Sequence, residues 1–253
     1  MSTELKRRYI KGESIFWISL VLLTTVALST VVFLIVKKSA GEGCALDMAY
    51  VISEPMGFSM IALAAGIFNM KAIQADFNSK IVMKYKTKRK LWHIQGICSC
   101  ISAFAVGAMV TLIALLNGYC IFGRFYNWES KQSFYRYSLL DRGHDYTVVM
   151  TPFLIIIISW IMTSLLFLMT FLLGMLVNNI TRSFSAAIVF MVIASGADSF
   201  VSCFYSRLNL YLSTFASPSR CFTKIGIVII INIVLFIAGF FIAPFREYYD
   251  KEV

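Results

Sequence analysis

The sequence predicts an all-α integral membrane protein, with six transmembrane helices in a single domain over residues 1–253. Three observations lead to this prediction. Of the 253 residues, 59% are hydrophobic and only 14% are charged, whereas soluble domains contain about 45–50% apolar and about 25% charged residues. The apolar residues form long continuous runs, unlike the alternating pattern of a membrane β-barrel. Short basic segments separate these runs, as expected for connections between transmembrane helices.

Six segments contain the roughly 20 mostly apolar residues that a helix needs to cross a bilayer. They cover approximately residues 15–36, 49–70, 97–121, 148–177, 184–205 and 225–245. The first is too long for a signal peptide and lacks the small-residue cleavage site. The second contains Glu54 and Pro55 near its start, so its regular part is expected to begin at Met56. The fourth exceeds the bilayer requirement and is expected to tilt or to project beyond it.

The distribution of Lys and Arg predicts the orientation. The connection between the second and third segments holds Lys71, Lys80, Lys84, Lys86, Lys88, Arg89 and Lys90. With six helices, this connection lies on the same side as both termini, and that side receives fourteen of the 23 Lys and Arg residues. Because cytoplasmic connections are enriched in these residues, we predict a multi-pass protein of the plasma membrane with both termini inside. The net charge of +10 then sets the topology and does not indicate nucleic-acid binding.

Two connections on the outer side, residues 122–147 and 205–223, mix aromatic residues with Arg and Lys. Such composition suits the headgroup region of a membrane, so both connections are expected to form interfacial or re-entrant helices. Cys44, Cys120 and Cys221 also fall near the outer side, which leaves a disulfide among them open.

The basic connection itself predicts an amphipathic helix, because Ile73, Phe77, Ile81 and Tyr85 recur at every fourth position. A basic turn over residues 86–90 and an anchor at Leu91-Trp92 follow it. The helix either docks a cytoplasmic partner in the manner of a helix in a groove or rests on anionic lipid. The candidate docking residues are Ile73, Phe77, Asn78, Lys80, Ile81, Lys84 and Tyr85.

Asp198 is the only acid well inside an apolar run. Carboxylates within a membrane are costly and usually face a cavity or a partner. Asp198 therefore either lines a translocation path or pairs with a base, or it lies near the outer water boundary and stabilises a helix end. The small-residue stretches 62–66 and 107–108 permit close helix packing.

The sequence offers no residues for enzyme chemistry. It contains no HExxH, GxSxG or P-loop pattern and no paired intramembrane carboxylates. His93 and His144 fall on opposite sides of the membrane in the predicted topology, so they cannot share a metal ion. We therefore expect no catalysis, no metal site and no cofactor bound by this chain.

The layout resembles that of an ABC-2-type ABC transporter permease. The stretch from Phe68-Asn69-Met70-Lys71 through Asp76-Phe77-Asn78-Ser79-Lys80 to Lys88-Arg89-Lys90-Leu91-Trp92 is similar to the coupling-helix region of small Gram-positive members. The ending Phe245-Arg246-Glu247 is similar to their short charged tails. The resemblance covers the whole chain as an architecture, and it points to the branch that exports peptides or confers immunity to bacteriocins.

This resemblance implies a mechanism and partners. Two permease copies, identical or related, would form the pathway within the membrane lipids, and a separate cytoplasmic ATPase pair would bind ATP and dock around Phe77 to Tyr85. Ser19, Thr24 and Thr25 could line the pathway, although such side chains also bond to their own helix backbone. Two alternatives are a membrane protein that confers toxin immunity by binding and a secondary transporter. The latter predicts repeats with matched ionisable groups, and Asp198 has no counterpart.

Overall fold

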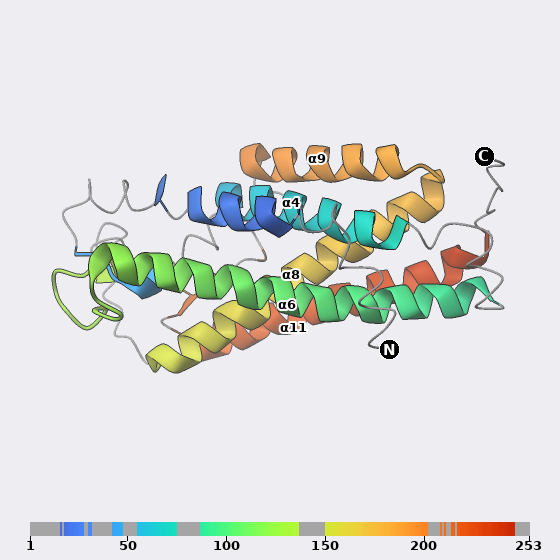
Figure 1. Ribbon diagram of the computed structural model, residues 1–253. Helices are drawn as coiled ribbons and strands as arrows, with labels where there is room; N and C mark the ends of the chain where they lie inside the picture. Colours follow the sequence, from blue (N-terminus) through green and yellow to red (C-terminus); the bar gives the residue numbers. More distant parts are fainter. Residues whose placement is uncertain are drawn as a thin grey trace.

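The computed structural model describes residues 16, 18–27, 30–31, 42–47, 55–74, 87–136, 150–201, 208, 210, 214–215 and 217–245. Within these ranges the protein is built from helices and the turns between them (Figure 1). The extended structure described there is one isolated parallel bridge between Glu42 and Ser133. The predicted all-α class is therefore confirmed for the described part of the chain.

Among the described residues, the longer helices and one 3-10 turn follow one another along the chain. They are α4 (Pro55–Gln74), α6 (Lys88–Phe122), α8 (Pro152–Thr181), α9 (Phe184–Val201), α11 (Pro218–Ile242) and η3 (Ala243–Phe245). In the part of the chain that the structure describes, three stretches are long and apolar enough to cross a membrane: Lys88–Phe122, Pro152–Thr181 and Pro218–Phe245. Shorter apolar helices cover Ile18–Ala27, Phe58–Ile73 and Phe184–Ala194. Each predicted apolar segment thus contains a helix, whereas the number of membrane crossings stays a prediction.

Helix α6 begins nine residues before the predicted apolar segment. The side chain of Thr87 accepts a hydrogen bond from the backbone N–H of Lys90 at 3.2 Å, which is the standard way to cap a helix start. Lys, Arg and Leu are also good helix formers. The prediction of a basic turn over residues 86–90 is therefore wrong from Lys88 onward, because those residues form the first turn of α6.

Two further boundaries differ from the prediction. Helix α11 begins at Pro218, seven residues before the predicted start, and a proline is well suited to a first helical position. Part of the expected interfacial segment 205–223 therefore belongs to α11. Residues 123–133 form turns, and residues 134–136 add only a short helical turn, so the expected interfacial helix is wrong for this described part of 122–147. Gly123 ends α6 in the left-handed conformation, with φ 65°, which glycine adopts without steric cost.

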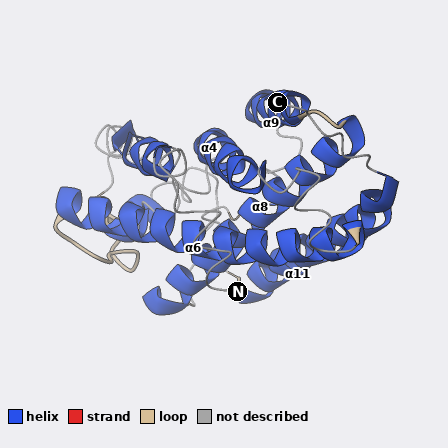
Figure 2. Cartoon of the chain, turned by 45° about the vertical axis from the view of Figure 1, so that its right-hand side comes forward, coloured by secondary structure: helices blue, strands red, loops and turns tan. Residues whose placement is uncertain are grey.

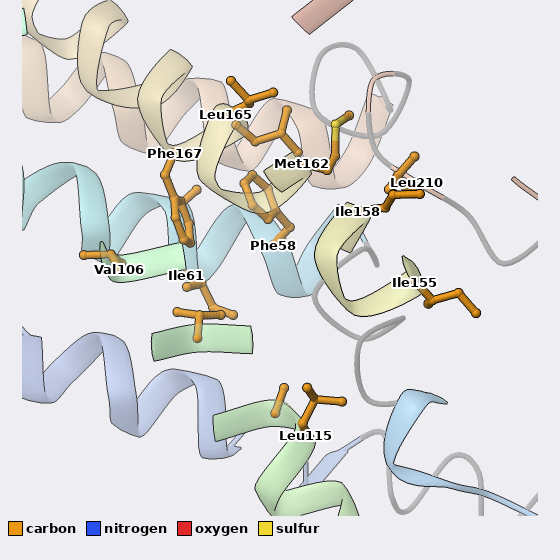
Figure 3. Packing of buried hydrophobic residues seen from close by; sticks show 14 of the residues in the cluster. Phe58, Ile61, Val106, Leu115, Ile155, Ile158, Met162, Leu165, Phe167 and Leu210 are labelled. Carbon is orange, nitrogen blue, oxygen red and sulfur yellow. The ribbon is translucent and has the colours of Figure 1, made fainter. Parts of the chain in front are cut away.

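Helix α8 lies at the centre of the bundle and packs against α4, α6, α9 and α11 (Figures 1 and 2). In its apolar window 61% of the residues are buried, compared with 17% in α11. In the core, the rings of Phe58 on α4 and Phe167 on α8 stack with their centroids 5.4 Å apart (Figure 3). From Ile227 to Phe241 the exposed side chains of α11 are apolar, as expected for a helix that faces lipid.

Helices α6 and α8 approach closely at Gly107. A Cβ atom at this position would meet the Ser164 hydroxyl and would lie 3.1 Å from the Ser164 Cα atom. Small residues allow helix backbones to approach in this way within membranes. The close packing predicted for residues 107–108 is confirmed here.

Polar side chains also join the helices. The Nδ2 group of Asn232 on α11 donates to the backbone oxygen of Leu165 on α8 at 3.0 Å. The indole N–H of Trp160 on α8 donates to the backbone oxygen of Phe104 on α6 at 3.2 Å. Hydrogen bonds of this kind between membrane helices contribute about 0.6 kcal/mol on average.

We expect Asn232→Ala to lower the free energy of unfolding by about 1 kcal/mol, because it removes one interhelical hydrogen bond and a small buried volume. Denaturant unfolding of the purified protein in detergent measures the change. Thr223→Ala is the matched control, since the exposed Thr223 hydroxyl bonds only within its own helix, to the Ser219 oxygen at 2.8 Å. Equal effects of the two substitutions would contradict a role for Asn232 between helices.

Candidate functional site

The candidate docking residues fall in two groups. Ile73 lies in the last turn of α4 and its side chain is fully buried, in a cluster that includes Met70 and Trp92. It therefore contributes to the interior of the bundle and not to a surface. The other six lie outside the described residues, and they are Phe77, Asn78, Lys80, Ile81, Lys84 and Tyr85.

Two of the candidate pathway residues, Thr24 and Thr25, bond to the backbone of the first helix. The Thr24 hydroxyl donates to the Leu20 and Val21 oxygens, each at 2.9 Å. The Thr25 hydroxyl is buried and donates to the Val21 oxygen at 2.8 Å. Both threonines thus satisfy the backbone of their own helix. Ser19 is exposed on the same helix.

Asp198 has a helical backbone in the last described turn of α9, which ends at Val201. Its side chain lies outside the described residues. This position is close to the carboxyl-terminal end of α9. The α8–α9 turn is at the other end of the helix.

One end of the bundle, the basic end, gathers charged residues of a single sign. The end of α4, the start of α6, the α8–α9 turn and the end of α11 lie there (right-hand side of Figure 1). The charged side chains described at the basic end are Lys71, Lys88, Arg89, Lys90 and Arg182. Those described at the opposite end include acids, and they are Glu42, Asp47, Arg124, Glu129, Lys131, Arg136, Arg220 and Lys224.

Several side chains hold α6 to α11 at the basic end. The Nζ atom of Lys88 donates to the Pro244 oxygen at 3.1 Å. The guanidinium of Arg89 lies 5.3 Å from the centre of the Phe240 ring, within the range of a cation–π contact. One turn further on, the indole N–H of Trp92 donates to the Phe236 oxygen at 3.0 Å.

The opposite end is closed by a cap, which we define as residues 42–47 and 123–136. The backbone of Glu42 donates to the Gln132 oxygen at 2.6 Å and accepts from Phe134 at 2.9 Å. The backbone N–H of Ala45 donates to the Arg124 oxygen at 3.0 Å. An ion pair between Arg124 and Glu42 covers this junction on the outside. Two segments about 80 residues apart in the chain are thus joined.

A buried carboxylate lies at the centre of the cap. Asp47 has no exposed surface, and its two oxygens accept hydrogen bonds from the Trp128 indole N–H and from the Cys44 backbone N–H, each at 2.7 Å. The Trp128 ring stacks on Tyr135 with centroids 4.3 Å apart and packs against Phe215. Both oxygens are therefore partnered inside an aromatic shell.

Burial raises the pKa values of two groups in the cap, Asp47 and Cys44. It raises the pKa of Asp47 from 3.8 to about 6, because the loss of water outweighs the two hydrogen bonds that stabilise the charged form. Burial, together with the nearby carboxylate of Asp47, also raises the pKa of the Cys44 thiol to about 12. The thiol is therefore protonated at neutral pH and unreactive.

The cysteines near the cap are not paired. Cys44, Cys120 and Cys221 are free thiols, and Cys221 donates to the Thr214 oxygen at 3.3 Å. The disulfide left open by the sequence is therefore not formed among these three residues. In the described part of the chain, no three His, Cys, Asp or Glu side chains gather as a metal site, and the expectation of no bound metal stays a prediction.

No family model, curated protein or solved structure matches the chain. The resemblance to ABC-2 permeases therefore rests on the layout of the sequence.

Sequence reasoning missed the cap carboxylate. Asp47 stands in a short segment between two apolar runs, where an acid normally meets water. Its burial depends on Trp128, which is 81 residues away in the chain. The one available signal was the aromatic content of residues 122–147, which indicates a packed segment but not its partner.

Proposed function

We propose that the chain is the permease subunit of an ATP-driven exporter of the ABC-2 type, located in the plasma membrane. Six helices would cross the bilayer with both termini inside. Two copies of the chain, or this chain and a related one, would enclose a path for a peptide or another amphipathic molecule. A separate ATPase would bind the ATP and supply the energy.

One observation carries the proposal: the chain between Gln74 and Lys88 leaves and re-enters the bundle at the basic end, where every described charged side chain is Lys or Arg. Cytoplasmic connections show this bias. The amphipathic pattern of Phe77, Ile81 and Tyr85 lies in that connection. An ATPase that docks there would act directly on α4 and α6.

The docking hypothesis predicts the result of reversing charge in the connection. We expect Phe77→Asp with Lys80→Glu and Lys84→Glu to weaken ATPase binding by roughly 30-fold or more, since loss of one aromatic hot spot costs about 2 kcal/mol. Co-purification and ATPase stimulation in proteoliposomes measure the effect.

A control for the two lysine reversals is Lys131→Glu with Arg220→Glu, because both residues are exposed at the cap end. This control should retain the ATPase. If the Phe77, Lys80 and Lys84 variant retains both binding and stimulation, the docking assignment fails. Cysteine accessibility that places residues 75–86 outside the cell would exclude the proposed orientation. An immunity protein that acts by binding alone would need no ATPase at all, so the same assay separates that alternative.

A further inference from the structure

The basic end carries a surface in which cations adjoin a long apolar stripe. Arg89 and Lys90 are exposed on the first turn of α6. Beside them on α11, exposed apolar residues recur at every fourth position, a spacing that places them on one side of a helix. This α11 stripe consists of Ile233, Ile237 and Phe241, which are 53%, 48% and 62% exposed, and it is continued by Phe245 of the following turn η3, which is 79% exposed.

The cations and the stripe belong to one surface because α6 is attached to the end of α11. Arg89 lies over the Phe240 ring, and Phe240 contacts Phe241 with ring centroids 6.0 Å apart. Lys88 bonds the Pro244 oxygen. The amino-terminal end of α6 also directs the positive end of its helix dipole toward this region. A negative group held there would meet two exposed cations and a helix start.

We infer that this surface binds an anionic phospholipid of the leaflet at the basic end, with the phosphate at Arg89 and Lys90 and an acyl chain along the α11 stripe. Twelve residues of helix rise by about 18 Å, and one leaflet of the hydrocarbon core is about 15 Å thick. The stripe is therefore as long as one acyl chain.

The apolar half of the surface decides between lipid and a soluble anion. A free phosphate or an acidic peptide would use the cations but would leave the stripe uncovered, and exposed apolar side chains gain nothing from a hydrated ligand. In the described part of the chain, no acidic side chain lies at the basic end to neutralise Arg89 and Lys90. Only an amphiphile with a negative headgroup complements both halves.

The test uses the full chain alone, without an ATPase, in nanodiscs of phosphatidylcholine with increasing phosphatidylglycerol. Native mass spectrometry counts retained phosphatidylglycerol, and thermal unfolding gives its stabilising effect. We expect Arg89→Gln with Lys90→Gln to weaken phosphatidylglycerol binding by about 30-fold, because each basic residue near an anionic surface contributes roughly fivefold. Lys131→Gln with Arg220→Gln removes the same charge at the cap end and should leave binding unchanged.

A second variant tests the stripe without altering charge. Phe241→Ala should reduce retention of phosphatidylglycerol by several-fold, because it removes part of the apolar area that the acyl chain would cover. Equal loss in the cap-end control, or full retention in the Arg89 and Lys90 variant, would overturn the proposal. So would competition by soluble glycerol phosphate at the strength of the lipid. Because no ATPase is present, these outcomes do not depend on the docking hypothesis.

Discussion

Gly239→Ala is expected to lower the free energy of unfolding by about 3 kcal/mol, the upper part of the range for overpacking a tight interior. A Cβ atom at Gly239 would overlap three atoms of the Trp92 ring. The ring cannot withdraw easily, because its N–H is bonded to the Phe236 oxygen at 3.0 Å and its side chain is only 1% exposed. Denaturant unfolding in detergent measures the loss.

Gly226→Ala on the same helix provides a matched control. A Cβ atom there meets nothing within 4 Å, so the change should be neutral or should stabilise the helix by up to about 1 kcal/mol. Combining Gly239→Ala with Trp92→Leu should cost less than the sum of the two single changes, because the smaller side chain leaves space for the new methyl group. Similar costs for the Gly239 and Gly226 substitutions would show that α6 and α11 do not pack as described.

The second large effect concerns pH and Asp47. Because the folded state holds the Asp47 proton with a pKa of about 6 against an ordinary 3.8, folding binds a proton between these values. The stability that this group contributes is full below pH 4, falls as the pH rises to about 6 and is constant above that. The total change is about 3 kcal/mol.

Thermal unfolding at a series of pH values between 4 and 8, compared with Asp47→Asn, isolates this contribution from that of the other carboxylates. The asparagine cannot titrate. The difference in stability between the two proteins should therefore change between about pH 4 and pH 6 and stay constant above that. Glu129→Gln is a suitable control, since this carboxylate is exposed on the same cap. A pH-independent difference between the wild type and Asp47→Asn would contradict the buried position of Asp47.

The positions of the helices were predictable, but their ends were less so. Runs of apolar residues mark the length of chain that suits a bilayer, and each run contains a helix. A helix, however, ends where its backbone groups are capped, and that depends on single residues. Thr87 starts α6 well before its apolar part, and Arg182 ends α8 with a φ of 58°. Hydropathy carries no information on either feature.

The candidate sites were also predictable only in part. Periodicity placed Ile73 on an apolar face, but it could not tell a face that docks a partner from one that packs in the bundle. The second outcome holds for Ile73, which lies with Trp92 in the interior. Likewise, the burial of Asp47 follows from contacts with residues distant in the chain. Local patterns predict which surfaces are apolar, and only the tertiary packing decides what covers them.

The bonds that hold α6 to the end of α11 have a mechanical consequence. Helix α6 is bonded to α11 through Trp92 and to the turn η3 after it through Lys88, whereas α4 packs on α9. The chain between Gln74 and Lys88 thus joins the helix pair α4–α9 to the pair α6–α11, and both pairs contact α8. A force applied to that connection would therefore act on both helix pairs at once.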